Sequence, residues 1–161
     1  MTMRNITTAS FTGHRIISKK VLPQLIQRLD STVESLVNQG TVRYLNGGAL
    51  GFDTHSAHAV LRCREKNPLV KLIMALPCLN QDERWSEKDK EIYKHLLNNA
   101  DEAIYVSDRP YFNGCMLLRN KWLVENSDIC IAYMLHGRSG ASQTVRLARK
   151  KGLQVINLAE S

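Results

Sequence analysis

Glycines stand close together in the stretch "LNGGALGFDTHSAHAV", residues 45–60, where an apolar segment runs into a helical pattern. Glycine allows positive φ and lets backbone N–H groups approach a ligand closely. A glycine-rich turn leading into a helix directs unsatisfied N–H groups and the positive end of the helix dipole at one point, which suits a phosphate. The stretch lacks both the GxGxxG spacing of the dinucleotide fingerprint and the Lys-Ser/Thr of a P-loop. By itself it therefore predicts either a phosphate site or only a tight turn.

Asp53 follows this turn at the start of the predicted helix. An acid there can cap the helix or favour its first turn, which is a structural role. It can equally bind a ribose hydroxyl. From spacing alone, the structural role is favoured.

A second glycine loop, "HGRSGAS" at 136–142, precedes another predicted helix and offers backbone N–H groups, hydroxyls and Arg138. Two helix starts at one sheet edge could hold two phosphates, or a phosphate and a sugar. Arg15 in "TGHR" and Arg119 in "LLRNKW" add guanidinium groups that can fork onto phosphate oxygens. The other interpretation of Arg119 is a salt bridge to a neighbouring carboxylate.

The remaining chemically active side chains give weaker signals. His14 can donate to a phosphate, although a loop histidine is usually only solvated. His55 and His58 are spaced i, i+3, and without a third ligand they do not predict a metal site. Cys115 has no histidine that the sequence pairs with it, so covalent catalysis is not expected. We therefore expect no metal and no cofactor. The side chains that could stack on a base, and that fit a core equally well, are Tyr44, Trp85 and Tyr111.

Length and composition indicate one globular domain spanning residues 1–161. Apolar residues make up 43% of the chain and charged residues 23%. No apolar run approaches the roughly 20 residues that span a bilayer. The N-terminus has no apolar region of secretory length, and the four cysteines form no CxxC pair, so we expect a cytoplasmic protein with reduced thiols and no membrane partner.

The net charge of +7 is unevenly distributed along the chain. Residues 119–151 contain seven Lys or Arg and two acids, whereas residues 82–102 contain seven acids and four bases. A basic segment of this kind favours anionic partners, from nucleotides to nucleic acid. For "RKK" at 149–151, favourable cations at a helix C-terminus are the simpler interpretation.

Apolar spacing predicts helices and strands in alternation. The predicted helices cover residues 22–37, 52–66, from about 86, 111–126 and 142–151. The predicted strands lie in "ITTASFTGH", "VRYLNGG", "VKLIMALP", "EAIYVS", "DICIAYML" and "LQVINL". This alternation predicts an α/β fold with a doubly wound, mostly parallel sheet and helices on both faces, as in Rossmann-like domains.

The loops that could do chemistry follow the carboxyl ends of predicted strands. They are "TGHR", "NGGALG", "LPC" and "HGRSGAS". In open α/β sheets, ligands bind at that edge, where the winding reverses. The sequence therefore predicts a single site at the carboxyl edge of the sheet.

Taken in order, "TGHR", "NGGALGFD", "LPC…Q…W", "PY…GCM…RN.W" and "SD..IAY…G.SG…T" make the chain resemble the YpsA-like branch of the SLOG superfamily, from Thr12 to Asn157. The resemblance implies a Rossmann-like fold, nucleotide binding and often a homodimer. The superfamily includes the LOG phosphoribohydrolases, the single-stranded-DNA-binding DNA-processing A domain, and sensors of cyclic ADP-ribose signals in antiviral systems. The ligand-binding positions that it implies are Gly13, His14, Arg15, Gly47, Gly48, Ala49, Gly51, Asp53, Arg119, Asn120, Gly140, Ser142 and Thr144, with Tyr111 as the stacking side chain.

The chain departs from the LOG-type PGGxGTxxE motif, whose glutamate supports glycosidic cleavage. Laid over "HGRSGASQT", the proline becomes His136, the second glycine becomes Arg138 and the glutamate becomes Thr144. Glycosidic hydrolysis usually needs a carboxylate, and Asp53 is the only nearby acid that we can nominate. The resemblance therefore supports binding better than turnover.

Three functional hypotheses follow. The first is binding of a phosphorylated nucleotide derivative, ADP-ribose-like or a cyclic nucleotide signal, by a sensor subunit or by a sponge such as a phage-encoded anti-defence protein. The alternative is a nucleotide N-glycosidic hydrolase with Asp53 as its acid. The third is single-stranded nucleic-acid binding, which ranks last because few aromatic residues accompany the basic ones.

Overall fold

Strands and helices alternate along the whole described chain of this computed structural model, which covers residues 7–135 and 140–159. The strands are β1 (Thr7–Gly13), β2 (Thr41–Asn46), β3 (Lys71–Leu76), β4 (Glu102–Tyr105), β5 (Ile129–Tyr133) and β6 (Gln154–Asn157). The helices are α1 (Leu22–Asn38), α2 (Phe52–Lys66), α3 (Glu87–Asn99), α4 (Cys115–Glu125) and α5 (Gly140–Lys151).

The strands form one sheet in the order β4-β3-β2-β1-β5-β6, and all neighbouring pairs are parallel. The chain moves outward in one direction from β1 to β4, then crosses back to place β5 on the other side of β1. The winding thus reverses at β1, where Gly13 is in register with Tyr133 of β5. The carboxyl ends of β1, β2 and β5 are therefore neighbours, as expected for a binding edge.

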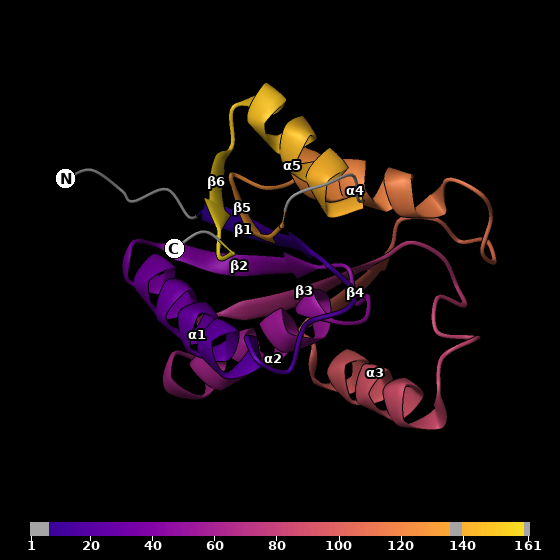
Figure 1. Cartoon of the computed structure of the whole chain (residues 1–161), viewed down its shortest axis with the longest axis horizontal. Coiled ribbons are helices and arrows are strands. Elements are labelled where there is room, and N and C mark those ends of the chain that lie inside the picture. Colours follow the sequence, from indigo (N-terminus) through magenta and orange to yellow (C-terminus); the bar gives the residue numbers. More distant parts are fainter. Residues whose placement is uncertain (1–6, 136–139, 160–161) are drawn as a thin grey trace.

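Helices cover both faces of the sheet, with α1, α2 and α3 on one side and α4 and α5 on the other (Figure 1). Successive strand residues point to opposite faces. Tyr44 packs in the cluster under α1, α2 and α3, whereas Leu45 packs with Leu123 of α4. The doubly wound α/β fold predicted from the sequence is confirmed.

The amphipathic spacing of α1 explains how it attaches to the sheet. Its buried residues are Leu25, Leu29, Val33 and Leu36, which form one stripe along the helix. Full burial of such side chains contributes about 1.5–3 kcal/mol each. Gly40, with a φ of 101°, ends the helix and turns the chain into β2.

Two predicted helix boundaries differ from the structure. The helix predicted at 111–126 begins only at Cys115, because the Tyr111 amide donates to the Asn80 side chain and Gly114 takes a left-handed conformation before the first turn. The last helix begins at Gly140, two residues earlier than expected.

None of the helices in residues 7–135 and 140–159 has the length and apolar character that a membrane-spanning helix needs.

Candidate functional site

The turn between β2 and α2 is held by its own side chains. Asn46, the last residue of β2, accepts a hydrogen bond from the Gly48 amide at 2.8 Å. Its Nδ2 donates to the Asp53 carbonyl oxygen at 2.9 Å. The Ala49 amide donates to Oδ2 of Asp53 at 3.1 Å. The Gly48 and Ala49 amides, which we predicted would face an anion, are thus already bonded within the turn.

Asp53 lies in the first turn of α2 and is 6% exposed. Burial raises its pKa to about 6, against the lowering effects of the Arg119 charge, the Ala49 amide and the Arg15 charge. The structural role favoured from the sequence is present, because this carboxylate closes the turn. The same acid also lies within electrostatic range of two arginines.

Arg119 reaches the same turn from the other face of the sheet. Its side chain projects from α4 and is buried, with 4% exposed. Nη1 donates to the Gly47 carbonyl oxygen at 2.6 Å, and Nε donates to Oδ1 of Asn120 at 3.0 Å. Burial lowers the pKa of Arg119, whereas the charge of Asp53 raises it.

No ion pair joins Arg119 to a carboxylate in residues 7–135 and 140–159. Within these residues, Arg119 therefore does not form the salt bridge that was the other interpretation of its role.

The loop after β1 joins the start of α2 to the exit of β5. The Phe52 amide of α2 donates to the His14 carbonyl oxygen at 3.0 Å. The Leu135 amide, two residues beyond β5, donates to Nε2 of His14 at 2.8 Å. Because Nε2 accepts, a neutral His14 carries its hydrogen on Nδ1. His14 therefore holds the exit of β5 against the start of α2.

The second glycine junction is described only from Gly140 onward, so the predicted contribution of Arg138 lies outside the described residues. Gly140 is exposed, whereas Ser142 and Thr144 are buried in α5. Oγ1 of Thr144 donates to the Gly140 carbonyl oxygen at 2.9 Å. This hydroxyl is thus used within the helix.

The other predicted side chains divide between surface and core. Tyr111 is 61% exposed, on a loop joined to the loop after β3 through Asn80. Tyr44 is fully buried and its hydroxyl donates to Val33, so it is a core residue. Trp85 packs edge-on against Tyr93. No three His, Cys, Asp or Glu among the residues that the structure describes are placed to hold a metal.

Two polar residues of the site were not among the predicted ones. Asn46 organises the β2 turn, and its position before two glycines is a typical signal for a side chain that bonds its own turn. Gln81 follows β3 and donates from Nε2 to the Gly47 carbonyl oxygen and to the Tyr93 hydroxyl, at 3.2 Å each. Its Oε1 is buried and has no hydrogen-bond partner among the described residues. No pattern in the sequence places Gln81 next to Gly47.

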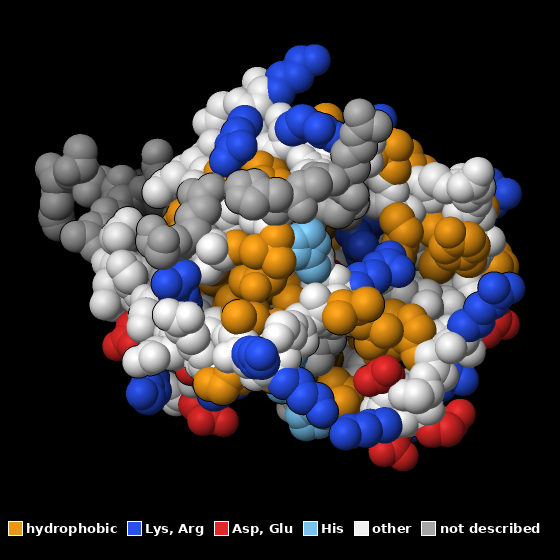
Figure 2. Space-filling view, viewed as in Figure 1, with side chains coloured by type: hydrophobic (Ala, Val, Ile, Leu, Met, Phe, Trp, Pro, Cys, Tyr) orange, Lys and Arg blue, Asp and Glu red, His pale blue; other side chains and the backbone are white. Residues whose placement is uncertain are grey.

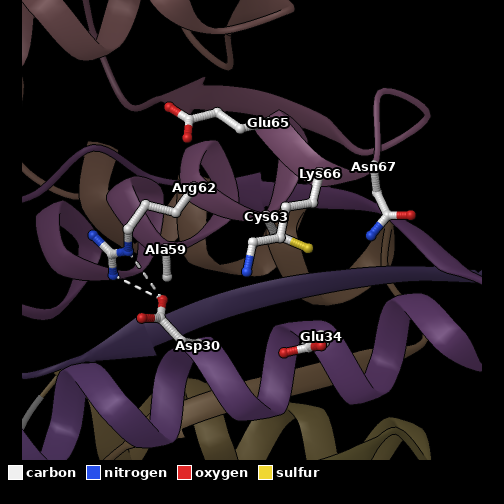
Figure 3. A pocket seen from close by; sticks show the side chains of 8 residues that line it. All are labelled: Asp30, Glu34, Ala59, Arg62, Cys63, Glu65, Lys66 and Asn67. Atoms are coloured by element: carbon white, nitrogen blue, oxygen red, sulfur yellow. Dashed lines mark hydrogen bonds and ion pairs between the residues drawn. The ribbon is translucent and has the colours of Figure 1, made fainter.

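The space-filling view shows a recess near the middle of one face, in which a histidine and a Lys or Arg side chain are set back behind apolar side chains (Figure 2). A cavity of about 240 Å³ lies elsewhere, between α1 and α2, and is lined by residues such as Glu34, Cys63 and Asn67 (Figure 3). Cys63 and Asn67 lie at the C-terminal end of α2, whereas Asp53 lies in its first turn. The recess, and not this cavity, fits the predicted sheet edge.

The arrangement is suited to holding an anion. Arg119, Arg15 and the start of α2 place positive charge where the winding reverses, and Asp53 compensates part of it. Asp53 is the acid whose charge acts on Arg119. A buried guanidinium beside a helix start is an arrangement that favours a bound anion.

Comparisons with known proteins match this fold and these motifs. The family model described as the YspA SLOG family matches residues 17–153. An uncharacterized SPbeta prophage-derived protein of Bacillus subtilis, YoqJ, is 30% identical over 139 residues, which are 79% of this chain and 81% of that protein. A UPF0398 protein of Halalkalibacterium halodurans is 24% identical over 94% of this chain and 84% of its own.

Two solved structures share the fold. DNA processing protein A from Helicobacter pylori, described for its single-stranded DNA binding mode, superposes with a TM-score of 0.67 and 23% identity. The match covers 93% of this chain and 64% of that one. DNA processing protein A from Streptococcus pneumoniae superposes with a TM-score of 0.66 and 19% identity over 93% of this chain and 49% of its own. The present chain thus spans less than two thirds of either protein.

Proposed function

The chain belongs to the YpsA SLOG family, and from that premise we propose that it binds a phosphorylated nucleotide derivative at the carboxyl edge of its sheet. The expected ligand is ADP-ribose-like or a cyclic nucleotide signal. The contact residues proposed for it are the predicted ones, with Arg119, Arg15 and His14 closest to the phosphates.

The observation that carries this proposal is the buried guanidinium of Arg119. A buried cation is costly unless it is paired and hydrogen-bonded. The Gly47 carbonyl and Asn120 satisfy part of its hydrogen-bonding capacity. Its charge is balanced in part by Asp53, whose own ionised form is disfavoured by burial, which raises the pKa of Asp53 to about 6. An anionic ligand would supply the missing negative charge.

The surrounding elements support the same assignment. The site lies where the sheet winding reverses, next to the N-terminus of α2, and both features favour phosphate. His14 can present its Nδ1–H as a neutral donor, because Nε2 is engaged by Leu135. Arg15 interacts electrostatically with Asp53 and Arg119.

A sensor subunit or a sponge that sequesters a signal is the biological form that we propose. The prophage origin of the similar Bacillus subtilis protein supports the phage-encoded variant. A cytoplasmic location and a homo-oligomeric state, a dimer or higher, are parts of this proposal. Size-exclusion chromatography with light scattering would test the oligomeric state.

Isothermal titration calorimetry with AMP, ADP-ribose and cyclic ADP-ribose isomers tests the proposal directly. We expect a micromolar or tighter Kd for at least one of them, and loss of that binding in Arg119→Gln. If every nucleotide in the panel fails to bind at millimolar concentration, the proposal is wrong.

The alternative is an N-glycosidic hydrolase that uses Asp53. A carboxyl with a pKa of about 6 is suited to general acid catalysis near neutral pH. Incubation with nucleoside monophosphates and ADP-ribose, followed by chromatography for released base, distinguishes turnover from binding. Release that persists unchanged in Asp53→Asn would exclude Asp53 as the acid.

Single-stranded nucleic-acid binding is the third proposal. DNA processing protein A from Helicobacter pylori, which has the same fold, is a protein with a single-stranded DNA binding mode. Lys and Arg side chains also gather over α5 (Figure 2).

A further inference from the structure

Gln81 brings a further element to the candidate site, the loop that follows β3. Its Nε2 donates to the Gly47 carbonyl oxygen at 3.2 Å, and Nη1 of Arg119 donates to the same oxygen at 2.6 Å. Two side chains, one from this loop and one from α4, thus converge on a single backbone oxygen. A ligand that lies beside the Arg119 guanidinium is therefore also close to the Gln81 amide.

The orientation of the Gln81 amide follows from its partners. A backbone carbonyl oxygen only accepts hydrogen bonds, so the end of the amide that faces Gly47 must be the NH₂ group. The other partner, the Tyr93 hydroxyl at 3.2 Å, fits either orientation, because a hydroxyl both donates and accepts. The Gly47 carbonyl therefore directs Oε1 of Gln81 away from the turn.

Oε1 of Gln81 is left as an acceptor that lacks a donor. Within residues 7–135 and 140–159, it is the one buried side-chain oxygen or nitrogen without a hydrogen-bond partner. Burying an acceptor unpaired carries the full cost of removing it from water. An unsatisfied acceptor of this kind, next to a buried cation, points to a ligand that supplies the missing donor.

We propose that Oε1 of Gln81 accepts a hydrogen bond from a ribose hydroxyl of the bound nucleotide, and that Gln81 thereby selects ribose over deoxyribose ligands. This inference rests on the function proposed above and specifies its ligand class. A site with a buried group meant for a substrate hydroxyl discriminates against an analogue that lacks the hydroxyl, because the group is then left unpaired.

The ribose, and not the base or the phosphate, is the part of a nucleotide that fits. The ligand must present an anion to Arg119 and a donor to Gln81 within a short span, because both side chains contact the Gly47 oxygen. The hydroxyls of a ribose phosphate are only a few bonds from its phosphate. The exocyclic amine of a base is farther away, and ionised phosphate oxygens are acceptors.

A small movement of the loop gives the hydroxyl access to Oε1. Gln81 as a whole is half-buried, whereas its Oε1 is shielded from solvent. Leu79, two residues before it, is 51% exposed, and Glu83, two residues after it, is also exposed. The loop is thus open to solvent on either side of Gln81, and a shift of these residues uncovers Oε1 while Nε2 stays bonded to Gly47.

Isothermal titration calorimetry with AMP and 2′,3′-dideoxy-AMP tests the proposal, since the two compounds differ only in the ribose hydroxyls. We expect the parent protein to bind AMP at least about 10-fold more tightly, as for one hydrogen bond to an otherwise unpaired group. Titration with 2′-deoxy-AMP and with 3′-deoxy-AMP then identifies the hydroxyl.

Gln81→Met keeps the length of the side chain but removes the acceptor, so the ratio of the two Kd values should fall to about 1. A purely structural role of Gln81 would weaken both ligands equally and leave the ratio unchanged. Gln81→Leu is the second variant if methionine prevents folding. Tyr93→Phe is the control, because it removes the other partner of Nε2 but leaves Oε1 in place, and it should keep the preference for AMP.

The outcomes separate this role of Gln81 from the proposed function. Equal Kd values for AMP and dideoxy-AMP in the parent, or an unchanged ratio in Gln81→Met, would overturn the role of Gln81 and leave nucleotide binding in place. No binding of AMP at millimolar concentration would also overturn it, and the proposed function would then stand only if ADP-ribose or a cyclic isomer binds.

Discussion

The Nη1 atom of Arg119 donates to the carbonyl oxygen of Gly47 at 2.6 Å, and this bond joins α4 on one face of the sheet to the turn that begins α2 on the other. A side chain at position 47 would occupy the place of the guanidinium, since a Cβ there would lie 2.3 Å from Nη1. Glycine at 47 is therefore required by the approach of Arg119. The hydrogen bond therefore couples the position of the turn at Gly47 to that of the Arg119 guanidinium.

Gly47→Ala is expected to displace the Arg119 guanidinium. The atom that the new methyl group meets is the far end of a side chain, so the cost is moderate, about 1–2 kcal/mol of the free energy of unfolding. Urea denaturation followed by circular dichroism measures it.

Gly51→Ala and Gly140→Ala are comparison variants, for which we expect a larger and a smaller loss of stability than for Gly47→Ala. Gly51 has a φ of 78°, and a Cβ there would lie 2.2 Å from the Arg15 carbonyl oxygen, so we expect a larger loss than at Gly47. A Cβ at Gly140 would meet no atom of the described residues within 4 Å, and alanine in the helix should be neutral or stabilising by up to about 1 kcal/mol. Equal losses at positions 47 and 140 would contradict the role of Arg119.

Arg119→Gln should weaken nucleotide binding by about 10–100-fold, since hydrogen bonds to a charged group contribute roughly 1.5–3 kcal/mol. Glutamine keeps an N–H donor for Gly47 but removes the charge. Calorimetry with the best ligand of the AMP and ADP-ribose panel measures the change in Kd. Arg62→Gln is the matched control, because Arg62 pairs with Asp30 at the surface between α1 and α2. An unchanged Kd in Arg119→Gln would remove Arg119 from the site.

Much of the fold could be predicted because it depends on local periodicity. The stripe of Leu25, Leu29 and Val33 identifies α1, and the apolar run of β3 indicates a strand covered on both faces. The carboxyl edge follows from the alternation of strands and helices. The start of α4 could not be predicted, because it depends on the hydrogen bond from Tyr111 to the distant Asn80.

The residues of the site were easier to nominate than their contacts. Glycines and arginines in loops after strands indicated the edge, and the structure brings Gly47 and Arg119 together. The sequence could not show that the Gly48 and Ala49 amides are bonded to Asn46 and Asp53. Such contacts depend on rotamers and on the path of the turn, which residue types alone do not specify.

Asp53 should make the stability of the protein fall as the pH rises from about 4 to 6. Burial raises the pKa of Asp53 from 3.8 in the unfolded chain to about 6 in the folded one, so the folded state binds the proton more tightly in this range. The stabilising effect of that proton is fully present below pH 3.8 and is lost as the pH rises through 6.

Asp53→Asn removes this titration. We expect the variant to be more stable than the parent at pH 7, by an amount on the order of 1–3 kcal/mol, and its stability to vary less between pH 4 and 6. Urea denaturation at several pH values measures both effects. Asp30→Asn, at an exposed ion pair, is the control that should leave the slope in place. A stability difference between Asp53→Asn and the parent that does not grow from pH 4 to 6 would contradict the raised pKa.

His14→Ala should release the exit of β5 from the start of α2. The variant loses the acceptor of the Leu135 amide, and the site loses its Nδ1–H donor. We expect nucleotide affinity to fall by about 10-fold, as for loss of one hydrogen bond of roughly 1.4 kcal/mol. Hydrogen exchange should show faster exchange of the Leu135 amide. His95→Ala, whose ring stacks on His58 between α3 and α2, is the control and should change neither quantity.

The basic side chains of α5 distinguish nucleic-acid binding from nucleotide binding. Arg146, Arg149 and Lys150 are exposed, and none of them forms an ion pair within the described part of the chain. If the protein binds single-stranded DNA only through such charges, neutralising each one should reduce the slope of log K against log salt by about 0.7. Fluorescence anisotropy of a labelled oligonucleotide at several salt concentrations gives this slope for the parent and for the triple Ala variant.

Lys88 and Lys94 on α3 provide a control pair of exposed lysines. Because Arg149 and Lys150 lie in the last turn of α5, at the other end of the helix from the proposed site, the triple variant should keep its affinity for ADP-ribose. Loss of both affinities together would indicate that the nucleotide and the DNA share one surface.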